Sequence, residues 1–398
     1  MLSFDVQKAY EYADAIAMPR RTGSPGEAEA TSYIVGRLRD FGLDVREDFF
    51  SFTTALRLFM KLTILSILIT LLLIFFLFHL NPFLTGVAVT LMLFLVLRFL
   101  SGMPFVATLR GLLFRDIPFT KMQESRNIIA TVGEGDTGEK PHVYILAHYD
   151  SKSQSLSLLY RVVLIGVFFL GSIYILGHYI IAALVWGTPG GWLYAVYCLT
   201  NFSGILLLFM VEGNYSPGAV DNASGVGVLL HLAEVISRER KRFKDLDITF
   251  VATGAEEEAL VGAFHLCKSL TKNSVPKDRS YFINLDGVGL KGNIYCTHKI
   301  GLHFTFTEGQ GDFVKLVKEA GNEEGLEIKT PPVVFGAAAD HFPFVYEGFN
   351  AVTLSTISKK SQVVHTYKDT IDQIEPEGLD GIGRLVLGVI EGIKDRQS

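Results

Sequence analysis

Hydrophobic and polar positions follow two different patterns along this chain of 398 residues. In three polar segments, short apolar runs rich in β-branched residues alternate with stretches of helical spacing. Such alternation is typical of an α/β protein in which helices cover both faces of a sheet. Two long stretches without any charged side chain separate these segments. The pattern therefore predicts one α/β domain that is interrupted by two apolar inserts.

The polar segments predict a helix near the N-terminus and a series of buried strands. Pro25 and Gly26 precede a segment with apolar residues at helical spacing, Tyr33, Ile34, Leu38 and Phe41, which Gly42 closes. Residues 45–52 then have an extended pattern. Further runs have the composition of buried strands, and several of them are followed by polar or glycine-rich residues: 127–132, 143–147, 248–252, 281–285 and 351–354.

The two apolar inserts are long enough to cross a bilayer. No Asp, Glu, Lys or Arg occurs at residues 62–97 or 162–211, stretches of 36 and 50 residues. A spanning helix needs about 20 apolar residues, so each stretch can form a helical hairpin. We expect transmembrane hairpins at 57–100 and 158–212, four transmembrane helices in all, and a discontinuous polar domain of residues 1–56, 101–157 and 213–398. The alternative is a pair of buried core hairpins in a soluble protein.

The basic residues near the inserts predict their orientation. They all lie on the side of the polar segments, whereas the hairpin turns carry none: Arg57, Lys61, Arg98, Arg110, Arg115, Lys121, Lys152 and Arg161. Because Lys and Arg are enriched on the cytoplasmic side of membrane helices, we expect a multi-pass membrane protein with a cytoplasmic polar domain. Residues 1–10 lack the basic and apolar pattern of a removed signal peptide.

Composition narrows the classes of function. Hydrophobic residues make up 49% of the chain, including 30 Phe, which is more than a soluble α/β enzyme needs and agrees with contact to lipid. A formal net charge of -5 without a basic stripe argues against nucleic acid as a partner. Cys198, Cys267 and Cys296 are widely spaced and indicate neither a disulfide framework nor a thiolate metal site.

Side chains that can bind metals come directly after the predicted strands. His148, the pair Glu256 and Glu257, and Asp286 each follow such a run. Ligands of open α/β sheets bind beyond the carboxyl ends of the strands, so we expect these side chains to meet. Each one alone has another explanation. His148 could form a surface pair with Asp150, the glutamates could begin a helix, and Asp286 could form a turn.

Taken together, these residues resemble the zinc-dependent exopeptidases, a family that includes leucyl aminopeptidases, glutamate carboxypeptidase, glutaminyl cyclase and the transferrin receptor. The matching segments are AHYDS at His148, GAVDNASG at Asp221, GAEEEALVGA at Glu256 and Glu257, NLDGVG at Asp286, and HTYKDT from His365. The resemblance covers all three polar segments. It implies an α/β fold with a mixed central sheet flanked by helices.

The resemblance also implies two zinc ions and a role for each residue. Glu256 would be the general base, and Asp150 would orient His148. Two imidazoles and three carboxylates without a thiolate suit Zn²⁺, and Co²⁺ or Mn²⁺ would also fit. Three carboxylates and a bridging hydroxide would balance two divalent cations. One ion would be held by His148 and Asp286, the other by Glu257 and His365, and both by Asp221.

Two segments depart from the family pattern. Ala259 and Ala263 replace the usual glycine and serine, which we interpret as packing changes on a helix. The segment AADHFPF has Ala339 where serine is usual. It would place Asp340, His341 and Phe344 in the substrate pocket, and the alternative is a structural loop before the strand at 351–354.

These features predict a membrane-integrated di-zinc aminopeptidase that acts on peptides. The aminopeptidase direction is favoured because no arginine cluster for a substrate carboxylate is recognisable. The second insert begins soon after Asp150, so we expect the active site near the bilayer. Membrane-derived peptides are then candidate substrates. The alternative role of the inserts is plain anchoring or a homo-oligomer contact. A single-zinc acyltransferase like glutaminyl cyclase and a non-catalytic receptor remain alternative functions.

Overall fold

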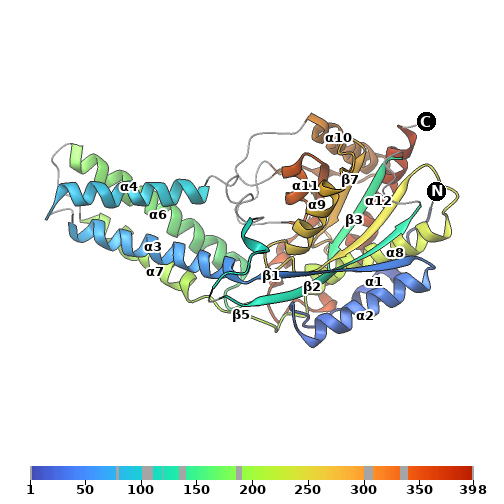
Figure 1. Cartoon of the computed structure of the whole chain (residues 1–398), viewed down its shortest axis with the longest axis horizontal. Coiled ribbons are helices and arrows are strands. Elements are labelled where there is room, and N and C mark those ends of the chain that lie inside the picture. The colour runs from blue at the N-terminus through green and yellow to red at the C-terminus, as the bar shows by residue number, and fades with distance from the viewer. Residues whose placement is uncertain are drawn as a thin grey trace. The chain divides into compact units, whose positions relative to one another are not determined.

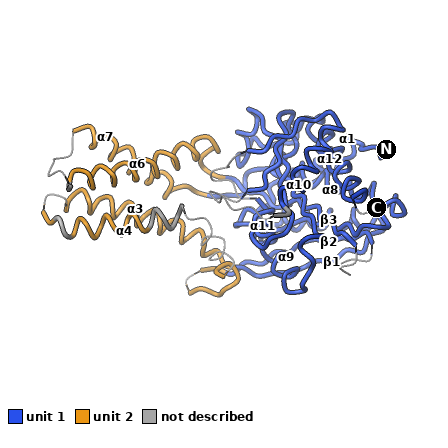
Figure 2. The backbone as a smooth tube through the Cα atoms, turned by 90° about the horizontal axis from the view of Figure 1, so that it is seen from above, with its two compact units in different colours: residues 1–52, 122–153, 212–398 blue, residues 53–121, 154–211 orange. Residues whose placement is uncertain are grey.

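The structure is a computed structural model that describes residues 2–77, 80–100, 111–118, 120–133, 140–184, 191–299, 308–331 and 339–396. The chain forms two compact units (Figure 2). The first consists of Met1–Phe52, Met122–Ser153 and Glu212–Ser398, and the second of Thr53–Lys121 and Gln154–Val211. Arg110 and residues 187–190, where the turn of the second predicted hairpin falls, lie outside the described residues.

A mixed sheet of eight strands forms the centre of the first unit (Figure 1). Its central strands β6, β3, β7 and β10 run parallel, while β2 and β8 are antiparallel to their inner neighbours. The carboxyl ends of the central strands therefore meet at one edge. In spatial order the strands are β1 (Asp44–Thr53), β2 (Met122–Val132), β6 (Asp247–Thr253), β3 (His142–His148), β7 (Ser280–Leu285), β10 (Asn350–Ile357), β8 (Asn293–Thr297) and β9 (Ile328–Lys329).

The predicted strands and the N-terminal helix are confirmed. Every apolar run that predicted a strand falls within one of these elements. The predicted helix is α2 (Pro25–Asp40), in which Ser24 caps the N-terminus by accepting a hydrogen bond from the Glu27 amide. All seven residues of β3 are buried, as expected for a parallel strand that is covered on both faces.

Helices cover both faces of the sheet (Figure 1). On one face, side chains such as Val143 and Ile145 share a single hydrophobic core with α1, α2, α8, α10 and α12. On the other face Tyr144 stacks on Phe282 with 4.4 Å between ring centroids. Phe282 in turn stacks on Phe344 of α11, which lies beside α9. The bounds are α1 (Val6–Asp14), α8 (Ser224–Arg238), α9 (Val261–Lys272), α10 (Glu308–Glu323), α11 (Phe342–Glu347) and α12 (Pro376–Asp395). Two short strands, β4 (Ser153–Gln154) and β5 (Glu212–Gly213), form a separate sheet.

The second unit is built from apolar helices that correspond to the two predicted inserts: α3 (Ala55–Leu77), α4 (Pro82–Leu100), α6 (Leu158–Leu184) and α7 (Trp192–Leu208). They share a small core in which Gly171 and Gly204 permit close approach. A Cβ atom at Gly171 would lie 2.1 Å from Thr200 Oγ1, and one at Gly204 would lie 2.5 Å from the Phe168 ring. Most other apolar side chains of these helices are at least partly exposed.

Three helices in the described residues are long and apolar enough to cross a membrane. Two of them, Ala55–Leu77 and Leu158–Ala182, belong to the predicted hairpins. The third, Ala219–Arg238, contains α8 and is 94% buried over its most apolar window, so we interpret it as a core helix. The apolar stretches Leu84–Phe94 and Trp192–Leu208 are shorter. The count of four spanning helices therefore stays a prediction.

Candidate metal centre

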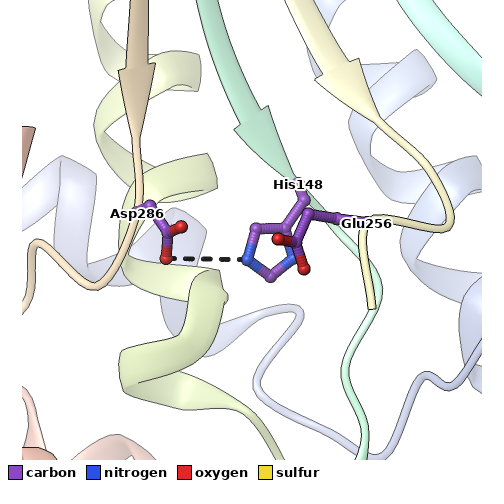
Figure 3. A group of neighbouring side chains, drawn as sticks. All are labelled: His148, Glu256 and Asp286. Carbon is purple, nitrogen blue, oxygen red and sulfur yellow. Dashed lines mark ion pairs between the residues drawn. The ribbon is translucent and has the colours of Figure 1, made fainter. Parts of the chain in front are cut away.

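Two groups of side chains that can bind metals lie at the carboxyl ends of the central strands. In each group, one ligand atom from every residue lies within 4.8 Å of the others. Figure 3 shows the first group, in which His148 ends β3, Glu256 follows β6 and Asp286 follows β7. The second group consists of Asp221, Glu257 and His365. The structure thus brings together all five predicted ligands and the predicted base.

Asp221 joins the two groups. Its Oδ1 lies 3.1 Å from His148 Nε2, and its Oδ2 lies 3.0 Å from His365 Nε2. His365 Nε2 also lies 2.9 Å from Glu257 Oε1. In the first group His148 Nε2 lies 3.8 Å from Asp286 Oδ1, the pair marked in Figure 3. A carboxylate that directs one oxygen toward each histidine has the geometry of a bridging ligand.

The donor atoms fit two divalent cations. His148 Nε2 and Glu257 Oε1 are buried and make no hydrogen bond with any residue that the structure describes, although Asp221 and His365 face them at ion-pair distance. Buried polar atoms without a hydrogen bond are costly and call for a partner. Imidazole nitrogens and carboxylate oxygens without a thiolate form a donor set that suits zinc. A cation in each group would also offset the repulsion among the carboxylates.

The carboxylate of Asp150 holds the turn that carries the two glutamates. It accepts hydrogen bonds from the Glu256 amide at 3.0 Å and the Glu257 amide at 3.1 Å. His148 Nδ1 instead faces the main-chain carbonyl of Asp150 at 3.1 Å, while the nearest carboxylate oxygen is 3.8 Å away. The expected orienting contact therefore comes from the main chain of Asp150, and its side chain fixes the glutamates.

Two further side chains fix the turn that carries Asp221. Asn222 Nδ2 donates to the Leu285 carbonyl at 2.7 Å, and Asn222 Oδ1 accepts from the Gly287 amide at 3.2 Å, so the turn is tied to both neighbours of Asp286. Asp369 accepts hydrogen bonds from the amides of residues 220 and 221 at 2.7 and 3.3 Å. Neither residue was predicted, although both lie within the segments GAVDNASG and HTYKDT.

The adjacent glutamates have opposite pKa shifts in the metal-free protein. Burial raises the pKa of Glu256 well above its usual range, and the negative charge of Glu257 adds to this effect. Burial also acts to raise the pKa of Glu257, but the positive charges of His365 and Lys152 outweigh it and bring the pKa to about 2. Glu257 is therefore a carboxylate at neutral pH, whereas Glu256 can hold a proton.

Lys152 belongs to this centre. Its Nζ lies 3.0 Å from Glu257 Oε2 and donates to the Glu257 carbonyl at 2.9 Å, and its side chain is only 13% exposed. Lys152 is one of the basic residues that predict the orientation of the inserts. Its ammonium group pairs with Glu257, a predicted ligand, which the sequence does not reveal.

The turn between β6 and α9 has an unusual backbone. Ala255, Ala259 and Leu260 have positive φ angles of 55°, 86° and 60°, and His365 has a φ of 63°. Such angles are uncommon for residues other than glycine and concentrate at functional sites.

The two alanines that depart from the family pattern lie in different places. Ala263 lies within α9, but Ala259 precedes it. The interpretation of Ala259 as a packing change on a helix is therefore wrong, since it occupies a turn position that favours glycine.

The predicted pocket residues Asp340, His341 and Phe344 are fully buried. Phe344 stacks on Phe282 at 4.1 Å between ring centroids, and its place in the pocket stays a prediction. Thr253 donates a hydrogen bond to Asp340, and His341 Nδ1 lies 2.6 Å from the Thr353 hydroxyl. Within the described residues, Asp340 Oδ1 and His341 Nε2 have no hydrogen-bond partner. A role in the pocket stays a prediction for these two.

A mixed α/β sheet with two groups of metal-binding side chains at the carboxyl ends of its central strands is an arrangement that suits metal-dependent hydrolysis. The sequence profile of peptidase family M28 matches residues 127–390, well over half of the chain. The chain belongs to this family.

The chain also resembles individual aminopeptidases in sequence and in fold. Aminopeptidase YwaD from Bacillus subtilis (strain 168) is 30% identical over 186 residues, which cover 45% of this chain and 39% of YwaD. The match thus spans less than half of that relative's length. Among solved structures, an aminopeptidase from Aneurinibacillus sp. strain AM-1 has a TM-score of 0.56 at 16% identity, covering 97% of this chain and 93% of its own.

A glutaminyl cyclase from an Acidobacteriales bacterium also has a TM-score of 0.56 at 16% identity, covering 99% of this chain and 96% of its own. BSAP, described as a zinc aminopeptidase from Bacillus subtilis, has a TM-score of 0.55 at 16% identity and covers 98% of this chain and 95% of its own. At this level of identity, these likenesses show the fold.

Proposed function

We propose that this protein is a membrane-integrated di-zinc aminopeptidase with Glu256 as its general base. The observation that carries the proposal is the placement of Asp221, which directs one oxygen toward His148 and the other toward His365. A single ion would need only one of the two ligand groups, whereas a carboxylate shared between two groups supports a pair of ions. The family and the YwaD relative support a peptide substrate cleaved at its N-terminus.

The residues divide into two ion sites with one shared ligand. Zinc ions bound there would supply Lewis acidity, which polarises a scissile carbonyl and lowers the pKa of a water molecule. Co²⁺ or Mn²⁺ would use the same donors. In this arrangement His148 and Asp286 would hold one ion, Glu257 and His365 would hold the other, and Asp221 would contact both.

Glu256 is the group that moves the proton. It would accept a proton from the attacking water and later deliver it to the amine that leaves. A general base works best when its pKa lies near the working pH, and burial raises the pKa of Glu256 in that direction. The hydrogen bond from its amide to Asp150 holds the turn on which it sits.

Membrane integration is the second part of the proposal. Ala55–Leu77 and Leu158–Ala182 have the length and hydropathy of spanning helices, and the charge-free stretches extend into the helix that follows each of them. The metal-binding unit would be cytoplasmic, and the substrates would be peptides encountered at the bilayer, such as membrane-derived fragments. A homo-oligomer is compatible with this arrangement.

The test is a metal and product analysis of the full-length protein purified in detergent. We expect two zinc ions per chain and the release of free amino acids from peptides with an open N-terminus. Acetylation of the N-terminus should abolish the release, whereas amidation of the C-terminus should not. Cleavage that responds to the C-terminal block instead would contradict the aminopeptidase direction.

Glutaminyl cyclase activity is the alternative that the solved-structure likeness favours. It would give one ion per chain and convert peptides with N-terminal glutamine to pyroglutamyl peptides without release of an amino acid. A protein that binds no metal and turns over neither kind of peptide would instead support a non-catalytic receptor.

A further inference from the structure

Arg20 is a fully buried arginine next to the metal centre. It lies between α1 and α2, outside the 127–390 region that matches the family. Its guanidinium donates only to main-chain carbonyls, those of Met18 at 3.2 Å, Tyr149 at 2.5 Å, Gly218 at 2.7 Å and Pro217. Within the described ranges it forms no ion pair, although several carboxylates of the centre act on it from a longer distance.

Apart from that of Met18, these carbonyls belong to the two segments that carry His148 and the shared carboxylate of Asp221. Tyr149 follows His148 directly at the end of β3, and Pro217 and Gly218 lead into the turn of Asp221. The segment of Arg20 is itself fixed to the strand end, because its amide donates to Ser151 Oγ at 3.1 Å and its carbonyl accepts from the Ser151 amide at 3.3 Å. Arg20 thus links the backbone of β3 to the turn.

Asp369 holds the same turn through its amide groups, whereas Arg20 holds it through its carbonyl groups. Arg20 contacts the carbonyls of residues 217 and 218, and the Asp369 carboxylate contacts the amides of residues 220 and 221. The turn is also close-packed, since a Cβ atom at Gly218, whose φ is +61°, would lie 2.6 Å from the Asp221 carbonyl oxygen. A cation on the carbonyls and an anion on the amides together fix the orientation of this turn.

A buried guanidinium without a contacting anion is costly unless its donors are well satisfied. Here burial lowers the pKa of Arg20 to about 10, while the charges of Asp369 and Asp150 oppose that shift. The planar guanidinium offers five donors in a fixed geometry, which a lysine cannot reproduce. The arrangement suits a residue whose task is to hold several carbonyls in one orientation.

We propose that Arg20 is a positioning residue that builds the Asp221 turn before any metal binds. The inference rests on the proposed metal centre. Because Asp221 is shared by both ligand groups, a displaced turn would weaken both sites together. A merely structural arginine would change the stability of the fold and leave the metal affinity unchanged.

The first test needs no variant. Hydrogen exchange of the amides of Val220 and Asp221 is measured in the full-length protein, once metal-free and once loaded with Zn²⁺. We expect strong protection in both states, because Asp369 and Arg20 hold the turn without metal. Free exchange in the metal-free protein, with protection only after zinc is added, would overturn the inference, since the metal would then build the turn.

The second test titrates Zn²⁺ into the metal-free variants Arg20→Lys and Arg20→Met. Both should bind zinc at least about tenfold more weakly than the wild type, as is typical when outer contacts of metal ligands are lost. Lysine should not restore the affinity despite its charge. Excess zinc should recover part of the turnover. The matched control is Arg384→Met, which removes ion pairs with Glu324 and Asp380 and should leave zinc affinity unchanged.

The two proposals fail in different ways. A wild-type protein that binds no zinc contradicts the proposed function. A wild-type protein that binds two ions, together with a folded Arg20→Lys variant of equal affinity, contradicts only the role of Arg20. If neither Arg20 variant folds, free exchange of these amides in the metal-free wild type would still overturn the inference.

Discussion

The two ligand groups have the same composition but different electrostatic surroundings. Each contains one histidine, one aspartate and one glutamate. In the second group Lys152 contacts Glu257, whereas in the described part of the chain no lysine or arginine pairs with Glu256 of the first. The pKa of Glu256 is therefore raised by burial, while that of Glu257 falls to about 2 because positive charges outweigh the burial. The charges of His365 and the buried Lys152 thus separate neighbouring glutamates into a proton carrier and a ligand.

The groups also differ in how the backbone supports them. The residues of the first group come from the ends of three neighbouring strands of the sheet, or the turns directly after them (Figure 3). In the second group Asp221 and His365 belong to turns that do not directly follow a strand of the central sheet in the chain, and His365 has a positive φ. Side chains such as Asp369 hold these turns. The second group therefore depends more on contacts made by the folded chain.

Glu256→Gln should have the largest effect, because it removes the proton carrier while keeping the shape of the side chain. We expect kcat to fall by about 10²- to 10⁴-fold, the range typical of a lost general base. The zinc content should stay at two ions per chain. Both quantities are measured on the same preparation, by peptide turnover and by metal analysis.

The outcome for zinc is what distinguishes a base from a ligand. One carboxylate oxygen of Glu256 lies within 4.8 Å of a ligand atom of His148 and of Asp286. Loss of one ion in Glu256→Gln would therefore show that Glu256 binds metal. Glu258→Gln is the matched control. This neighbouring glutamate pairs with Arg21 at 3.4 Å rather than with the ligand groups, and its variant should retain most of the activity.

His365→Ala should remove the ion of the second group and leave the first group occupied. His148→Ala should do the reverse, so each variant is expected to hold one zinc ion in place of two. The measurement is zinc content after dialysis against a limiting zinc concentration. His265→Ala provides a histidine control, because its partner is Asp48 and it lies outside both groups. Loss of both ions in each variant would mean that the groups form one inseparable site.

Periodicity located the strands and helix α2, for a physical reason. A strand buried on both faces must be apolar throughout, as in β3, so its position is visible in the sequence. Because His148 ends β3 and Asp286 directly follows β7, their meeting could be foreseen from the topology of a parallel sheet. Asp221 and His365 have no such signal and were found through the segments that resemble a family.

The contacts that hold the site could not be predicted in this way. Arg20, Asp150 and Asp369 act on main-chain atoms, and these atoms are equivalent at every residue, so no spacing in the sequence marks them as partners. The contact of Lys152 with Glu257 could not be predicted for a related reason. A lysine next to an apolar insert has the pattern of a membrane flank, and only the folded structure brings it to Glu257.

Lys152→Met tests the difference between the groups directly. Removing one partner of a buried ion pair leaves the other charge uncompensated, and we expect the metal-free protein to lose about 3 kcal/mol of unfolding free energy. Zinc would compensate Glu257 in the loaded protein, so the loss there should be smaller. Urea unfolding with and without zinc measures both values.

The control for this prediction is Lys277→Met, which breaks a more exposed pair with Glu347 and should change stability by less than about 1 kcal/mol. An equal loss with and without zinc in Lys152→Met would contradict a role for the lysine in the charge of the second group. It would instead assign Lys152 to packing alone.

The smallest predicted effect concerns the turn that supplies one glutamate to each group. Ala259 has a φ of 86° there, a conformation that costs a residue with a Cβ about 1–2 kcal/mol. Glycine avoids this strain but loses about 0.5–1 kcal/mol of chain entropy, so Ala259→Gly should raise the unfolding free energy by about 0.5 kcal/mol without changing zinc content. Ala263→Gly, inside α9, should lower it by about 1 kcal/mol or more. If Ala259→Gly lowers stability as much as that control, the methyl group of Ala259 contributes packing that outweighs its strain, and the turn is held by side-chain contact rather than by Asp150.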